Sequence, residues 1–158
     1  MVENRIEKTV EVNAPAEDVW RALTDHKAFG EWFRVRLDGP FVVGEVTTGE
    51  ITYPGHEGVK WTSITERMEA PRLFCFRWPH TQEPDPDPSR EPATRVEFHL
   101  QPTATGTRLT IIESGFENLP EHQRVTALRS NDEGWEIQAR NIKAHVEKAH
   151  VEKAHLEG

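Results

Sequence analysis

The hydrophobic pattern of this chain changes its period once, after Gly115, and that change limits the folds that the chain can adopt. Between Val35 and Gly115, apolar and polar residues alternate with the period of two that is typical of β-strands. Beyond Gly115, apolar residues recur at steps of four and three, which is the inward stripe of a long α-helix. The stripe consists of Trp135, Ala139, Ile142, Val146 and Ala149. The sequence therefore predicts a block of strands followed by one long helix over about residues 119–150.

The part of the chain before this helix predicts seven strands and one or two short helices. Residues 6–12 alternate and stop at Asn13-Ala14-Pro15, where Pro15 suits the first turn of a short helix that ends near Asp25. A second short helical turn over residues 27–32 is less clearly signalled. Glycine and proline turn signals divide the remainder into six strands. Their expected bounds are 35–38, 44–53, 58–69, 72–79, 94–102 and 106–115.

These elements predict the fold class. A seven-stranded antiparallel sheet leaves one face to be covered, and only the C-terminal helix is long enough to cover it. The expected fold is therefore α+β, a helix-grip in which a curved sheet wraps around one long helix. Such a sheet cannot close tightly along the whole helix, so a cavity is expected between them. A length of 158 residues fits one domain, assigned here to residues 1–150 and followed by a tail over 151–158.

The helical stripe is interrupted on its N-terminal side. Continued backwards from Trp135, it meets the polar Asp132 before it reaches Leu128. Either the helix breaks near residues 130–131, close to Gly134, or Asp132 faces a polar part of the interior. We favour a break or kink, because a glycine weakens the interior of a helix.

The end of the chain repeats a five-residue unit, beginning with Lys143-Ala144-His145-Val146-Glu147. A step of five residues advances about 140° around a helix. The repeated His145, His150 and His155 therefore spread around the helix instead of lining one side. No metal site is expected there, and residues 151–158 are interpreted as a solvated helical tail.

Charge and cysteine content exclude several classes of partner and site. The chain has 19 basic and 27 acidic residues, a formal net charge of −8, which disfavours nucleic acid as a partner. The single cysteine, Cys75, excludes an internal disulfide and a multi-cysteine metal site. No apolar run approaches ~18 residues, and the N-terminus lacks a secretory hydrophobic region. We expect a cytoplasmic protein without stable membrane insertion.

Residues 79–92 differ from the rest of the chain in composition. Five of the 11 prolines fall in this window, together with four acidic residues and one arginine. It contains no apolar residue to bury, and proline cannot donate to a sheet. It is expected to form a long, mobile, acidic hairpin loop.

Several short segments, in order along the chain, resemble one protein family. They are Ala14-Pro15-Ala16-Glu17-Asp18-Val19-Trp20-Arg21-Ala22-Leu23, Glu31-Trp32-Phe33, Glu69-Ala70-Pro71-Arg72-Leu73-Phe74 with Arg77-Trp78, Gly106-Thr107-Arg108-Leu109-Thr110, Glu113-Ser114-Gly115-Phe116 and Gly134-Trp135. They span about residues 4–150. The chain resembles the START-like, Bet v-type helix-grip superfamily (SRPBCC), in the branch named after the activator of the heat-shock protein 90 ATPase.

This resemblance implies a ligand-binding cavity beneath the long helix. Members of the superfamily bind lipids or polyketides, some cyclise polyketides, and the eukaryotic namesake of the branch stimulates a chaperone ATPase. The namesake carries an additional N-terminal domain for chaperone contact, and we expect no such domain in these 158 residues. The resemblance therefore does not transfer the co-chaperone role, because function belongs to sites and not to folds.

The sequence contains no recognisable catalytic motif. It lacks G-x-S-x-G, H-E-x-x-H and a phosphate-binding glycine loop. Cys75 alternates with Phe74 and Phe76, so it is expected on the opposite sheet face as a small packing residue. His56 and His80 fall on loops that could open at the cavity mouth, but a zinc site needs three or four convergent ligands. We expect no cofactor and no metal.

Glu113 is the most notable acidic residue. Alternation places it with Leu109 and Ile111 on the inward face, near the end of its strand. A carboxylate against an apolar wall is costly unless it is paired, and its pKa would tend to rise. Two roles are open: a polar anchor for a ligand, or a salt-bridge or backbone-bonding partner at the strand end.

Aromatic side chains from separate elements are expected to converge on the cavity. Each could pack in the core, and our functional hypothesis is that a subset lines the cavity and binds a small hydrophobic or aromatic molecule. The alternatives are a co-chaperone-like module that contacts a chaperone or other protein, and a polyketide cyclase-like enzyme. The candidate ligand-binding residues are Trp32, Arg34, Trp61, Phe76, Trp78, Phe98, Ile111, Glu113, Trp135, Ala139 and Ile142.

Overall fold

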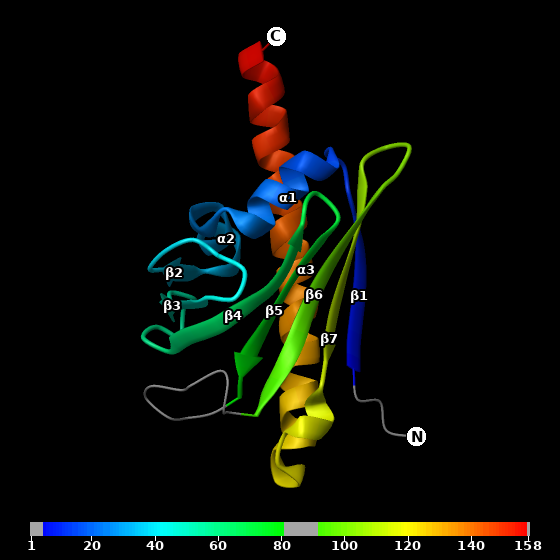
Figure 1. Ribbon diagram of the computed structural model, residues 1–158. Coiled ribbons are helices and arrows are strands. Elements are labelled where there is room, and N and C mark those ends of the chain that lie inside the picture. Colours follow the sequence, from blue (N-terminus) through cyan, green and yellow to red (C-terminus); the bar gives the residue numbers. More distant parts are fainter. Residues whose placement is uncertain (1–4, 81–91, 158) are drawn as a thin grey trace.

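A computed structural model describes residues 5–80 and 92–157 of the chain, and the side chains up to Lys153 (Figure 1). The elements follow the order that the sequence predicts, with two short helices after the first strand. They are β1 (Arg5–Val12), α1 (Ala16–Thr24), α2 (His26–Phe33), β2 (Val35–Leu37), β3 (Val46–Ile51), β4 (Lys60–Glu69), β5 (Leu73–Pro79), β6 (Ala93–Pro102), β7 (Thr107–Ser114), the 3-10 turn η1 (Phe116–Asn118) and α3 (Glu121–Glu157).

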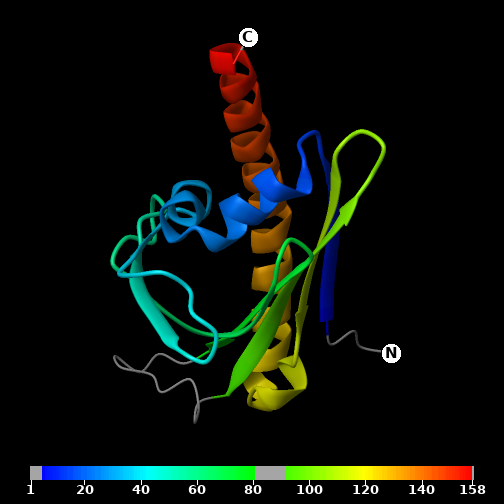
Figure 2. The same cartoon turned by 45° about the horizontal axis from the view of Figure 1, so that its top comes forward.

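Within the described residues, seven strands form one antiparallel sheet in the order β1-β7-β6-β5-β4-β3-β2. The sheet curves around α3, and the C-terminal part of α3 projects beyond it (Figures 1 and 2). A register shift between Thr65 and Arg67 in β4 adds to the bend, as β-bulges do. The predicted α+β helix-grip fold is confirmed.

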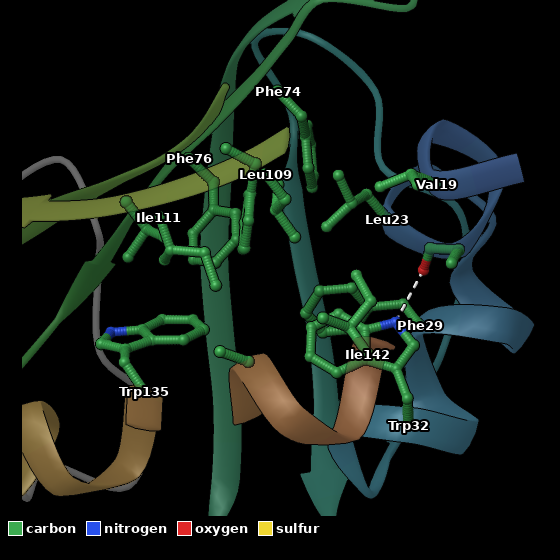
Figure 3. Close-up of a cluster of buried hydrophobic side chains, with 14 of the residues drawn as sticks. Val19, Leu23, Phe29, Trp32, Phe74, Phe76, Leu109, Ile111, Trp135 and Ile142 are labelled. Atoms are coloured by element: carbon green, nitrogen blue, oxygen red, sulfur yellow. Dashed lines mark hydrogen bonds between the residues drawn. The ribbon is translucent and has the colours of Figure 1, made fainter. Parts of the chain in front are cut away.

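The core lies between the concave face of the sheet and the apolar stripe of α3. Sheet residues such as Phe74, Phe76 and Ile111 face Trp135 and Ile142 of the helix (Figure 3). The aromatic rings contact one another in tilted and edge-to-face pairs, and buried side chains of this size supply most of the stability of such a core. Most of the space beneath the middle of α3 is therefore filled by protein.

The predicted break in the long helix is wrong, because α3 is continuous from Glu121 to Glu157. Asp132 does not face the interior either. Its carboxylate lies 3.2 Å from the Lys8 Nζ atom of β1, and Glu136 lies 3.1 Å from the same atom. The residue that turns inward at this level is Asn131. A polar residue thus continues the inward stripe without breaking the helix.

Local capping places α2 against the sheet. Asp25 accepts hydrogen bonds from the backbone N–H groups of Lys27 and Ala28 at 2.9 and 3.2 Å, which lower its pKa and start the helix. The helix ends where Arg34 adopts a left-handed conformation, with φ of 70°. Gly30 permits the close return to β2, because a Cβ there would lie 2.4 Å from the Val35 carbonyl oxygen. The side chain of Phe33 is thereby held beside α3.

Two other predictions concern residues 79–92 and the repeated segment at the end of the chain. The acidic loop predicted over 79–92 falls mainly on residues 81–91, which lie outside the described residues. In the repeated segment, His145 and His150 contact different acids, Glu31 at 3.9 Å and Asp18 at 3.0 Å, as their spread around the helix requires. The side chain of His155 lies outside the described part.

Candidate functional site

A fully buried carboxylate marks the junction between the sheet and α3. Glu113 is 0% exposed and follows Leu109 and Ile111 on the inward face of β7, as alternation predicts. It pairs with Val96 of β6 on one side and with Ile6 of β1 on the other. A strand on each side therefore holds its backbone, and its side chain is directed at the N-terminal half of α3.

Hydrogen-bond donors surround both carboxylate oxygens of Glu113. The Trp135 indole N–H donates to Oε1 at 2.9 Å, and the Trp78 indole N–H donates to Oε2 at 2.8 Å. The Asn131 amide N–H₂ group lies 3.0 and 3.1 Å from the two oxygens. The Thr94 hydroxyl donates to Oε2 at 2.5 Å, and His80 Nε2 lies 3.4 Å from it. We call these six residues the Glu113 cluster.

The geometry of two strand pairs and one helical turn builds the Glu113 cluster. Trp78 and Thr94 are direct partners across β5 and β6, and the Trp78 indole N–H also lies 2.9 Å from the Thr94 hydroxyl oxygen. Asn131 and Trp135 are four residues apart, so they lie one turn apart on the same face of α3. His80 follows β5 directly, and its Nε2 atom lies 2.8 Å from the Thr94 hydroxyl.

This arrangement favours the ionised form of Glu113. Burial opposes ionisation and would raise the pKa of the carboxyl group, but hydrogen bonds from His80, Thr94, Trp78 and Trp135 outweigh burial and hold its pKa below the usual 4.5. The sequence-based expectation of a raised pKa is therefore wrong. The difference is explained by the five surrounding hydrogen-bond donors, because both oxygens of an ionised carboxylate act only as acceptors, whereas the protonated form would also bring a donor.

A pocket of about 350 Å³ opens next to the Glu113 cluster, between α3, the end of α2, β5 and the segment after β3. Three members of the cluster, Trp78, Asn131 and Trp135, form part of its wall, while Glu113 lies behind them. Its apolar wall includes Phe33 and Ile137. The described lining residues are Phe33, Tyr53, His56, Trp78, Ser130, Asn131, Glu133, Gly134, Trp135, Ile137 and Gln138.

Gly134 leaves part of this pocket open. It lies inside α3 and lines the pocket, and a Cβ added there would meet no atom within 4 Å. A glycine in a helix interior costs about 1 kcal/mol relative to alanine. The chain thus carries a residue that weakens the helix at the point where a side chain would enter the pocket.

The structure brings only some of the candidate ligand-binding residues to this pocket. Trp78 and Trp135 line it, and Glu113 hydrogen-bonds both of their indoles. Arg34 is exposed and is absent from the described lining. The other seven are buried in the packed core, and the indoles of Trp32 and Trp61 are hydrogen-bonded there. They are Trp32, Trp61, Phe76, Phe98, Ile111, Ala139 and Ile142.

Sequence reasoning missed several residues of the site. Asn131 and Thr94 belong to no recognisable motif. Two signals could have found them: a buried glutamate requires hydrogen-bond donors, and the apolar stripe of α3 is interrupted by a polar residue near position 131. Phe33 belongs to the segment Glu31-Trp32-Phe33, of which only Trp32 was among the candidate residues. Tyr53 and His56 reach the pocket from a turn whose path the sequence does not specify, although His56 was placed near the cavity mouth.

The single cysteine is not an activated nucleophile. Cys75 is 3% exposed, and burial, together with the nearby Glu66 carboxylate, raises the pKa of its thiol to about 12. In residues 5–80 and 92–157, no three His, Cys, Asp or Glu side chains gather closely enough to hold a metal ion. None of the helices described is long and apolar enough to cross a membrane.

The comparison with protein families agrees with this architecture. The family described as "Activator of Hsp90 ATPase homolog 1-like protein" matches residues 13–147, which include both short helices, strands β2 to β7 and most of α3. The chain belongs to this family. No curated protein matches it significantly.

Solved structures share the fold at low sequence identity. Protein MLL2253 from Mesorhizobium loti is 23% identical with a TM-score of 0.74, over 91% of this chain and 97% of that one. The Aha1 dimer from Colwellia psychrerythraea is 20% identical with a TM-score of 0.67, over 93% and 97%. DynU16, a protein of the dynemicin biosynthetic locus, is 21% identical with a TM-score of 0.73, over 94% of this chain and 49% of DynU16. These likenesses show the fold.

Proposed function

We propose that this member of the family binds a small, flat, apolar or aromatic molecule in the pocket beside the Glu113 cluster. The observation that carries the proposal is the opening at Gly134, where an aromatic-walled pocket of about 350 Å³ meets a helix position without a side chain. Ligand pockets are typically lined by apolar and aromatic side chains with a few polar groups. The low-cysteine, acidic composition supports a cytoplasmic setting for this binding.

Three aromatic rings would supply most of the binding free energy. Trp78 and Trp135 are stacked, with ring centroids 5.8 Å apart, and Phe33 contacts both rings edge-to-face at 6.4 and 6.1 Å. Burial of apolar ligand surface against these rings stabilises the complex by roughly 25 cal/mol per Å² before the cost of association. The side chains of Ser130 and Gln138 would orient polar groups of the ligand.

Glu113 acts in this proposal as a positioning residue. It holds the two indoles and the Asn131 amide in place but does not itself line the pocket. A cyclase-like enzyme would need an acid or base within reach of its substrate. The pocket geometry therefore supports binding over proton transfer by Glu113.

Filling the open helix position is expected to block binding. In Gly134→Leu, the new side chain enters the pocket, so the affinity for a neutral bicyclic aromatic probe, 1-naphthylacetamide, should fall at least tenfold. The free energy of unfolding should not decrease, because leucine is a better helix former than glycine by roughly 0.8 kcal/mol. Titration followed by the indole N–H signals of Trp78 and Trp135 measures the affinity, and urea denaturation measures the stability.

Gly134→Ala is the matched control. It gains roughly 0.8–1 kcal/mol of stability, and it should weaken probe binding only slightly, because a methyl group fills little of the pocket. The proposal fails if wild-type protein shows no shift at Trp78 or Trp135 with a broad panel of neutral aromatics. It also fails if Gly134→Leu binds the probe as tightly as wild type.

Trp32→Phe tests whether Trp32 is a core residue that does not take part in ligand binding. The Trp32 indole N–H donates to the Ala22 carbonyl oxygen at 2.8 Å inside the core (Figure 3). Its removal should lower the free energy of unfolding by about 1–3 kcal/mol, from a lost hydrogen bond and a small cavity. The affinity for 1-naphthylacetamide should stay within twofold of wild type. A large loss of affinity at unchanged stability would instead place Trp32 in the binding site.

A further inference from the structure

Among the described residues that line the pocket, the formal charge has one sign. Glu133 carries a formal charge, and none of these described lining residues is lysine or arginine. Behind the wall, the Glu113 cluster holds a second carboxylate, which is fully buried and favoured in its ionised form. Water screens a buried charge poorly, so its potential extends into the adjacent pocket.

Arg34 and Arg129 are next to lining residues in the chain, but both are exposed and outside the described lining, so water screens their charges more strongly than that of the buried Glu113. Lys8 lies on the β1 side of α3, where it pairs with Asp132 and Glu136. Arg95 pairs with Glu66, at 2.8 Å between Nε and Oε1. The groups that could become cationic are two histidines, His56 in the pocket wall and His80 at the Glu113 cluster.

The same carboxylate also changes the two indoles of the pocket wall. Trp78 and Trp135 each donate their ring N–H to Glu113, at 2.8 and 2.9 Å. Donation to an anion moves electron density onto the indole ring and strengthens the negative potential of its faces. Tryptophan is already the best ring for binding cations. Two indoles polarised by one carboxylate therefore form a wall that attracts positive charge and repels negative charge.

We propose that the pocket selects its ligands by charge: it accepts neutral or cationic aromatic molecules and rejects aromatic carboxylates and phosphates. The inference rests on the proposed function, since it specifies the ligand class for the same pocket. It excludes fatty acids and other anionic lipids as ligands of this site. It favours amines, amides and phenols attached to flat ring systems.

Three probes with one ring system and closely matched carbon skeletons test the charge selection. They are 2-(1-naphthyl)ethylammonium, 1-naphthylacetamide and 1-naphthylacetate, titrated at low ionic strength at pH 8, above the ordinary histidine pKa of about 6.5. The expected order of affinity is ammonium, then amide, then carboxylate, with the carboxylate at least about tenfold weaker than the amide. Added salt should reduce the difference in affinity between the three probes, because it screens the charges.

Two glutamine variants locate the source of the selection. Glu113→Gln removes the buried charge and should reduce the preference for amide over carboxylate to within about threefold. Because this variant could fold poorly, Glu133→Gln provides a second test, since it removes a charge from an exposed side chain of the pocket wall. It should strengthen binding of the carboxylate about two- to threefold. Glu152→Gln, on an exposed part of α3 away from the pocket, is the matched control and should change nothing.

The outcomes separate this inference from the proposed function. If none of the three probes binds, the binding proposal itself fails, and with it the charge selection. If the carboxylate binds as tightly as the amide, or more tightly, the pocket binds aromatic molecules but the charge selection is wrong. If the wild-type protein shows the expected order of affinities, but neither Glu113→Gln nor Glu133→Gln changes that order or the ratios of the affinities, the two carboxylates are not the source of the selection. The inference is then overturned.

Discussion

Replacement of Glu113 by leucine is expected to lower the free energy of unfolding by about 3–5 kcal/mol, the effect of breaking a buried hydrogen-bonded charge network. Leucine is of similar size, but it leaves the Trp135 indole N–H and the Asn131 amide without an acceptor, and the Trp78 indole N–H with the Thr94 hydroxyl alone. Urea denaturation measures the loss. Glu11→Leu is the matched control: Glu11 lies on the neighbouring strand β1, pairs with Arg108 at the surface, and should cost no more than about 1 kcal/mol.

The same residue gives stability a defined dependence on pH. The pKa of Glu113 is lower in the folded than in the unfolded chain, so its contribution is present above the ordinary value of 4.5 and is lost as pH falls through the folded pKa. Glu113→Gln should therefore flatten the decline of stability between pH 6 and pH 3. A variant with the same acid profile as wild type would show that other carboxylates cause the decline.

Asn131→Asp is expected to produce the opposite pH dependence. The change is nearly isosteric but places a second carboxylate about 3 Å from Glu113, where the two charges cannot both remain ionised without a large cost. We expect a loss of about 2–4 kcal/mol at pH 7. One carboxyl group of the pair then has a raised pKa, so stability should increase as pH falls from 7 towards 5.

Asp132→Asn is the control for this substitution. It exchanges the same two residue types in the opposite direction, aspartate to asparagine, at the adjacent position. Asp132 is half-exposed and pairs with Lys8. The expected change is below about 1 kcal/mol, with no reversal of the pH profile. If Asn131→Asp proves as harmless as Asp132→Asn, the Asn131 amide is not part of the buried network.

The sequence alone predicted more of the fold than of the site. Each of the seven strands lies within about two residues of its predicted bounds, because alternation and turn residues are local signals. The inward direction of Glu113 followed from the same alternation. The one structural error, a break in α3, came from treating Asp132 as part of the buried stripe, when the inward residue at that level is its neighbour Asn131.

Which tryptophans border the pocket could not be predicted from local sequence. Trp32, Trp61, Trp78 and Trp135 look alike in sequence. The first two and Trp135 are all buried, yet of these three only Trp135 borders the pocket, together with the half-buried Trp78. The difference depends on how far the sheet closes on α3 at each level. Residues of α2, of β5 and of the segment after β3 border the pocket together with α3, so no single segment of the chain encodes it.

The sequence by itself determined the change of period at Gly115, and with it the curved sheet, the long helix and the inward carboxylate, because each depends on residues close together in the chain. The tertiary structure alone decided the charge state of Glu113 and the position of the pocket. The donors to Glu113 come from β5, β6 and α3, and the opening at Gly134 exists only because no neighbouring element reaches it. Hydrogen bonding and packing between distant segments are properties of the folded chain.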